Sequence, residues 1–173
     1  MENKRKLIVR ALACALLMTG CASTQMVTVR PADTNLRTYS KVVLTTTSRE
    51  GVNAESEALN LEAQVASKIG ALSVFPEVVT GDAVASDDGT LLIQIEITQM
   101  RRVSKTARFF GGALAGKASL DAEVRFVDAT TRRELGTYTV SGKSGGTGMS
   151  GGTEAAISRA ADAVANIVSE HCR

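Results

Sequence analysis

Histidine is scarce in this sequence of 173 residues, and its scarcity excludes several kinds of active site. The single histidine, His171, is the third residue from the C-terminus. A nucleophilic or metal centre normally needs a positioned base or several ligands, so we expect no catalytic triad, no metal site and no cofactor. The protein is therefore predicted not to be an enzyme. The alternative is an enzyme that works through carboxylates, for which the candidates are Asp121, Glu123 and Asp128, with Glu96 as a further acid.

Long apolar runs are also absent. The uncharged run from Ala11 to Met18 is too short to span a bilayer, which needs about 20 apolar residues. It follows a basic segment and is followed by a small residue, Gly20, which together are typical of a secretory signal peptide. We therefore predict that residues 1–20 are a signal peptide, cleaved between Gly20 and Cys21. The basic residues of the segment are Lys4, Arg5, Lys6 and Arg10.

A strong net charge is lacking once the signal peptide is removed. The remaining chain has 16 Lys and Arg against 17 Asp and Glu, a net charge of −1. Binding to nucleic acid favours a basic domain or patch, so we expect no nucleic-acid partner.

Cysteines are too few for an internal disulfide bond in the mature chain. Cys14 is removed with the signal peptide, and Cys21 is expected to be modified, as argued below. Cys172 is then alone, and a single thiol cannot form an internal bridge. Because Cys172 is the penultimate residue, we expect it to lie in a frayed C-terminus.

Residues 111–118, GGALAGKA, differ from a phosphate-binding loop only in the last letter. That letter matters, because Ala118 has no hydroxyl group for magnesium. The loop must also open into a helix, whereas Ser119–Val127 alternates with period two, as a strand does. A signal peptide would also carry the protein away from the ATP pool. We therefore expect no nucleotide ligand.

The end of the signal segment, Met18-Thr19-Gly20-Cys21, resembles the bacterial lipobox. The resemblance implies that Cys21 becomes the first residue of the mature protein and carries acyl chains, which form a stable membrane anchor. Ala22 follows the cysteine where Asp favours the inner membrane in enterobacterial lipoproteins. The resemblance thus implies an outer-membrane lipoprotein that faces the periplasm of a Gram-negative bacterium.

The mature chain shows the patterns of one two-layer α+β domain. Leu91–Val103 and Ser119–Val127 alternate apolar with polar residues, and Glu134–Ser141 follows as a third strand of an antiparallel meander. Lys41–Thr47 is a further strand, and Phe75–Thr80 is a short one. We predict a mainly antiparallel sheet of about four to five strands with two helices on one face.

The two helices are expected from apolar stripes at helical spacing. They lie between Asn53 and Val74 and from Thr153 to near the C-terminus, with Gly142–Gly152 as a flexible loop before the second. Residues 21–38 are predicted to be the lipidated cysteine and a tether with one short strand at Met26–Arg30, and residues 39–173 the domain. The predicted stripes are Leu59, Ala63, Ala66, Ile69 and Leu72, and then Ile157, Ala161, Val164 and Val168.

An apolar loop with several glycines joins two of the predicted strands, at Arg108–Gly116. One interpretation is a connection in which Phe109 and Phe110 cap the core. The other is an exposed loop that contacts a partner or a bilayer, since long loops in compact domains are often functional. On the second interpretation the contact residues are Arg108, Phe109, Phe110 and Leu114.

Three segments together resemble a family of uncharacterised Gram-negative lipoproteins with a domain of unknown function. They are Arg101–Ala118, with its Arg-Phe-Phe and Gly-Lys-Ala letters, Val124–Thr131 (VRFVDATT), and Gly145–Gly152 before the last helix. Thr131-Arg132 stands where the family usually has Thr-Gly. At fold level the order of elements is similar to periplasmic lipoproteins of the curli-channel and transporter-auxiliary type.

These observations predict a membrane-anchored periplasmic lipoprotein that is a non-enzymatic accessory or binding subunit of an envelope assembly or transport system. The expected contacts are the membrane, through the acyl chains, and either a protein partner or further copies of the chain. A structural lipoprotein that assembles with itself, and an enzyme that acts on envelope material, are the alternatives.

Overall fold

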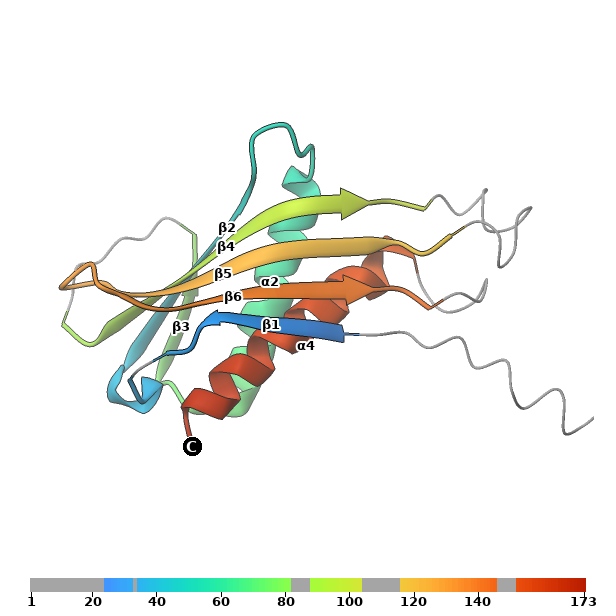
Figure 1. Ribbon diagram of the computed structural model, residues 1–173. Helices are drawn as coiled ribbons and strands as arrows, with labels where there is room; N and C mark the ends of the chain where they lie inside the picture. Colours follow the sequence, from blue (N-terminus) through green and yellow to red (C-terminus); the bar gives the residue numbers. More distant parts are fainter. Residues whose placement is uncertain (1–23, 33, 82–87, 104–115, 146–151) are drawn as a thin grey trace, which may run out of the picture.

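The computed structural model describes residues 24–32, 34–81, 88–103, 116–145 and 152–173. They form two layers, a twisted sheet and a pair of helices that cover one of its faces (Figure 1). The elements are β1 (Thr24–Arg30), η1 (Leu36–Thr38), β2 (Lys41–Ser48), α2 (Glu55–Leu72), β3 (Glu77–Thr80), β4 (Thr90–Arg101), β5 (Ser119–Asp128), β6 (Glu134–Lys143) and α4 (Thr153–His171).

The sheet has the strand order β1-β6-β5-β4-β2-β3. The predicted antiparallel meander of β4, β5 and β6 is confirmed, and β1 joins β6, again antiparallel. β2 lies parallel to β3, because the crossover through α2 returns the chain to the end at which β2 begins, and β2 also lies parallel to β4. The α+β fold is confirmed, with six strands where four or five were expected and a sheet that is mixed.

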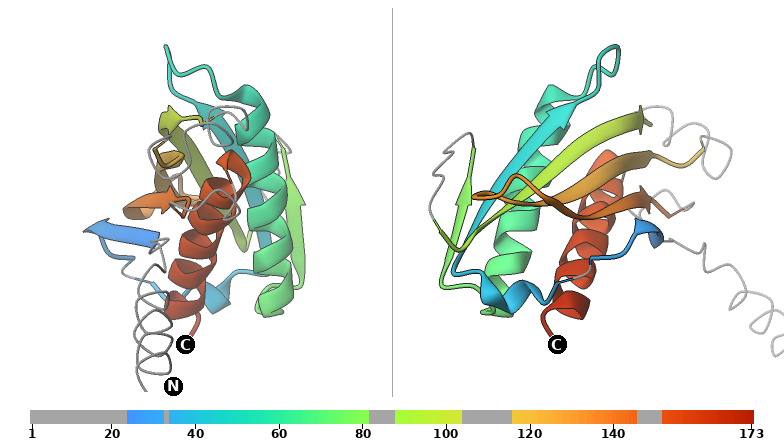
Figure 2. Two further views of the ribbon diagram at one scale, coloured as in Figure 1. Left: turned by 90° about the vertical axis from the view of Figure 1, so that its right-hand side faces the viewer. Right: turned by 60° about the vertical axis from the view of Figure 1, so that its left-hand side comes forward.

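Alternation along the strands separates the two faces of the sheet. In β4, Leu91, Ile93 and Ile97 have no exposed surface and point into the core, where Phe126 and Ala122 of β5 lie opposite Ile93 and Ile97. The intervening positions of both strands point to the other face and carry mostly polar side chains. The helices α2 and α4 pack side by side on the apolar face (Figure 2).

The predicted apolar stripe of α4 is confirmed, whereas that of α2 is partly wrong. Leu59 is 70% exposed, and Ala63 is also exposed. The buried face of α2 contains Ala58 and not Leu59. Neighbouring residues of a helix point about 100° apart, so burying Ala58 turns Leu59 toward solvent. The buried set is Glu57, Ala58, Leu61, Val65 and Ile69.

Both termini of the described chain are part of the fold. Most of the predicted tether is ordered, since β1 pairs with β6 and Leu36 in η1 is completely buried. The predicted flexible loop, Gly142–Gly152, is wrong in its first two residues, because β6 continues to Lys143 and includes Gly142, and residues 146–151 lie outside the described part of the chain. Gly142 lies against α4, where even a Cβ atom would overlap the backbone of Ala156.

Candidate functional site

The lipidation site and the predicted contact loop lie outside the described residues. These are Gly20 and Cys21 in the first case and Arg108, Phe109, Phe110 and Leu114 in the second. The structure does place their neighbours in the chain. Thr24, three residues after Cys21, starts β1 at the same end of the sheet where β4 ends at Arg101 and β5 begins at Ser119.

We call this part of the molecule the Thr24 end. It is defined by the register of the strands, in which Thr24 lies opposite Gly142, and Ser119 lies between Lys143 and Arg101. In Figure 1 it is the right-hand side, where the ends of β4 and β6 and the starts of β1 and β5 come together.

A cavity of about 540 Å³ opens at the Thr24 end, between the loop after β2 and the end of β4. Arg102 closes one side of it. Its Nε and Nη2 atoms donate to the two carboxylate oxygens of Glu57 at 2.6 and 2.8 Å. These hydrogen bonds lower the pKa of the almost buried Glu57 to about 2. The lining residues are Gly51, Val52, Asn53, Thr98, Gln99, Met100, Arg101, Arg102 and Ser119.

Two of the candidate carboxylates, Glu96 and Glu123, lie opposite each other on β4 and β5, on the face away from the helices. Each has an arginine partner. Arg49 donates to Glu96 from Nε at 3.1 Å and from Nη2 at 2.6 Å, and Arg125 Nε lies 3.2 Å from Glu123 Oε1. The hydrogen bond from Arg49 lowers the pKa of Glu96. The arrangement is two neighbouring Arg–Glu ion pairs beside a smaller cavity of about 210 Å³ that is lined in part by Glu96 and Arg125.

The other two candidate carboxylates lie elsewhere. Asp128, at the far end of β5, holds a turn: its Oδ1 accepts from the backbone N–H of Thr131 at 2.7 Å and from its hydroxyl at 2.8 Å. These bonds, together with one from the Tyr39 hydroxyl at 2.9 Å, lower the pKa of Asp128. Asp121 lies near the opposite end of the same strand. The structure therefore brings Glu96 and Glu123 together but not the full set.

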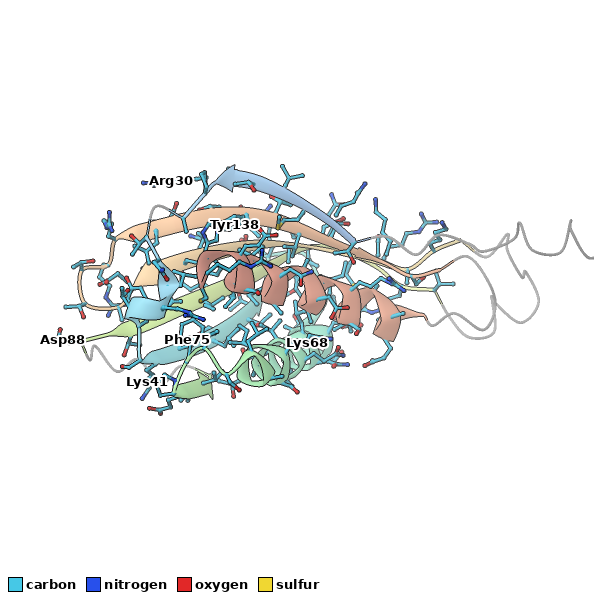
Figure 3. The ribbon with its side chains drawn as sticks, turned by 90° about the horizontal axis from the view of Figure 1, so that it is seen from below. Arg30, Lys41, Lys68, Phe75, Asp88 and Tyr138 are labelled. Carbon is cyan, nitrogen blue, oxygen red and sulfur yellow. The ribbon has the colours of Figure 1, made fainter. Side chains whose placement is uncertain are left out.

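The C-terminus is tied to the sheet, which corrects the expectation that it frays. The hydroxyl of Tyr138 in β6, which is labelled in Figure 3, accepts a hydrogen bond from the Ala32 N–H at 2.7 Å. The same hydroxyl lies 2.6 Å from His171 Nε2. Cys172 is 2% exposed, and burial raises the pKa of its thiol. Within the described ranges, no group of three or more His, Cys, Asp or Glu side chains could hold a metal ion.

The edge strand β1 is exposed along its whole length. Among the described strands it pairs only with β6, so its outer edge has unpaired N–H and C=O groups. Met26, Val27 and Val29 are 39%, 61% and 64% exposed. The sequence predicts this strand at Met26–Arg30 but not its place at the edge of the sheet. None of the described helices is both long and apolar enough to cross a membrane.

Comparison with solved structures finds the same fold in PelC. Two PelC dodecamer structures from Paraburkholderia phytofirmans align with a TM-score of 0.55, at 12% and 13% identity, over 85% and 83% of this chain and 97% and 96% of PelC. Lipoprotein GNA1162 from Neisseria meningitidis is 12% identical, with a TM-score of 0.39 over 61% of this chain and 81% of that one. At such identities the likeness concerns the fold.

Comparison by sequence identifies the family. No curated protein matches this chain in sequence. The model of DUF4410, a domain of unknown function, matches residues 27–148, from within β1 to beyond the end of β6. This match covers more than half of the chain and confirms the expected kinship with an uncharacterised family. The chain belongs to the DUF4410 family.

Proposed function

We propose that this protein is a lipid-anchored, non-enzymatic subunit of an envelope assembly or transport system. Acyl chains on Cys21 hold it in the outer membrane, and the domain faces the periplasm, where it binds a protein partner. The lipobox-like letters before Cys21 support the anchor. The observation that carries the partner-binding part is the exposed edge strand β1.

The edge of β1 has the properties of a strand-pairing site. An extended segment of a partner can add to such an edge, with backbone hydrogen bonds giving affinity and side-chain contacts giving specificity. Soluble proteins commonly protect exposed edges with Lys or Pro, but β1 instead exposes Val27 and Val29 on its surface. Contact with a partner would remove these apolar side chains from water.

The test is to extract the full-length lipoprotein gently from native membranes and to measure the mass and composition of the extracted complex. We expect a complex that contains a second kind of protein. The variant Val27→Lys with Val29→Lys should release that protein, because charges on the edge oppose strand addition.

The matched control is Leu59→Lys with Ala63→Lys, which adds the same charge to the exposed face of α2. It should leave the complex intact. Recovery of the lipoprotein without any other protein species, in wild type and variants alike, would contradict partner binding.

The second candidate function is self-assembly, which the likeness to PelC favours, because the PelC structures are dodecamers. In that case the same edge would meet another copy of the chain. The extraction experiment separates the two candidates: a discrete oligomer of this chain alone, which the Val27→Lys and Val29→Lys variant breaks into monomers, supports self-assembly. A monomer at all concentrations excludes it.

A further inference from the structure

The short link between Cys21 and Thr24 limits where the membrane can lie. Three residues in extended form span about 11 Å at most. If the acyl chains are on Cys21, as proposed above, the Thr24 end must lie within about that distance of the bilayer surface. The opposite end, with η1 and the turn before β6, lies on the left-hand side of Figure 1, away from the start of β1.

The Thr24 end is lined by basic side chains, although the mature chain as a whole has a net charge of −1. The last residues that pair across β6, β5 and β4 at this end are Lys143, Ser119 and Arg101, so that the serine has one basic residue on each side. Arg101 is exposed, and Lys117 is exposed just before β5.

Glu50, Glu55 and Glu154 are exposed acids toward the same end, but none of the ion pairs between described residues involves Arg101 or Lys143. Glu57 pairs with Arg102, which leaves the charges of Arg101 and Lys143 unaffected. Asp121 is set back two residues along β5 from Ser119, or about 7 Å. Lys143 Nζ donates to the neutral side chain of Gln25 at 3.0 Å and keeps its positive charge at the surface.

We propose that the Thr24 end docks on the anionic phospholipid headgroups of the membrane that holds the acyl chains, through Arg101 and Lys143. This inference rests on the proposed anchor at Cys21. The anchor and the headgroup contacts then fix the domain in one orientation, with the strands rising from the bilayer. The edge of β1 stands at an angle to the membrane and stays accessible to a partner from the side.

The test uses the acylated full-length protein in vesicles that contain anionic phosphatidylglycerol. A fluorophore is attached to Ser119→Cys at the Thr24 end or to Thr130→Cys at the opposite end. The native thiol of Cys172 is buried and does not compete for the label. Quenching by lipids that carry a nitroxide on the headgroup then reports which end touches the surface.

We expect strong quenching at Ser119→Cys and little at Thr130→Cys. Adding Arg101→Ser and Lys143→Ser should lower the ratio of docked to undocked protein roughly 25-fold, because each basic side chain at an anionic surface contributes about 1 kcal/mol. Salt at about 0.5 M should act in the same direction. The matched control, Arg37→Ser with Arg132→Asn, removes two charges from the opposite end and should change nothing.

Three results would overturn the inference. Equal quenching of the two labels would show that the domain has no fixed orientation. Quenching at Ser119→Cys that persists in neutral phosphatidylcholine vesicles, or in the Arg101→Ser and Lys143→Ser variant, would show that the contact is not electrostatic. A measured protein mass that lacks acyl chains on Cys21 would refute the proposed anchor itself. That mass is measured separately from the quenching, so failure of the anchor and failure of the docking can be told apart.

Discussion

Two single residues, Gly142 and Glu57, are placed where a substitution should destabilise the fold. Gly142 lets α4 approach β6 so closely that no side chain fits between them. Glu57 is a carboxylate that is nearly buried at the start of α2, where it is stabilised by two hydrogen bonds from Arg102. Each makes a prediction about stability that does not depend on the proposed function.

Gly142→Ala should lower the free energy of unfolding by about 3 kcal/mol, because the added methyl overlaps the backbone of α4. The control is Gly70→Ala, where no atom lies within 4 Å of the new Cβ. That substitution removes a glycine from the interior of α2 and should raise stability by up to about 1 kcal/mol. Urea unfolding measures both. A neutral Gly142→Ala would show that α4 does not pack as described.

Because of Glu57, the free energy of unfolding should fall as the pH becomes acidic. Its pKa is about 2 in the folded protein against an ordinary value of 4.5, so its contribution is complete above pH 4.5 and is lost as the pH falls toward 2. The size should be about 2 kcal/mol, since Arg102 is half exposed and water screens the pair.

The measurement is the unfolding free energy as a function of pH, for wild type and for Glu57→Gln. Glu57→Gln should be less stable at neutral pH and should lack this part of the acid dependence. Parallel curves for the two proteins would mean that the Glu57–Arg102 pair does not form in solution.

At the level of the elements, the apolar periodicity of the sequence predicted the wrong buried face for α2. Leu59 and Ala63 belong to an apolar series at helical spacing, but a second series starts at Ala58 and continues through Leu61, Val65 and Ile69. The two series share Ile69. The face that packs is decided by contact with β2 and with α4, since α2 lies against both.

Leu61→Ala should therefore cost about 3 kcal/mol, the range for removing a buried leucine side chain. Leu59→Ala removes the same atoms from a side chain that is 70% exposed and should change stability by less than about 0.5 kcal/mol. Chemical denaturation of the two variants compares the faces directly. If Leu59→Ala were the more damaging, the predicted stripe would be right and the orientation of α2 in the structure wrong.

For the whole molecule, both ends of the described chain take part in the fold. β1 closes the sheet at one edge, and the C-terminus is held through the contact of His171 with Tyr138. The C-terminal residues thus belong to the cooperative unit, because Cys172 is part of the main apolar core.

The thiol of Cys172 should consequently report global unfolding. With Cys21 acylated, it is the one free thiol expected in the mature chain, and burial raises its pKa and slows its reaction. A thiol reagent should label it only as denaturant unfolds the protein, with the same midpoint as the circular dichroism signal. Rapid labelling without denaturant would show that the C-terminus frays.

Local patterns in the sequence determined much of this protein. The alternation in β4 and β5, the stripe of α4 and the meander were all predicted from spacing, because these signals depend on residues close in the chain. The α+β class follows from the same elements. The kinship with an uncharacterised family was predicted from the residues of Arg101–Ala118 and two further segments, and the family model confirms it. The signal segment and the lipidation site are also read from local letters, and they stay predictions.

Contacts between distant residues were decided only by the tertiary structure. The parallel pairing of β2 with β4, the face of α2 that is buried, and the meeting of Glu96 with Glu123 join parts of the chain that no local pattern connects. The same holds for Arg102 and Glu57, which are 45 residues apart. The physical reason is that periodicity specifies which face of an element is apolar, whereas its partner is selected by packing of the whole core.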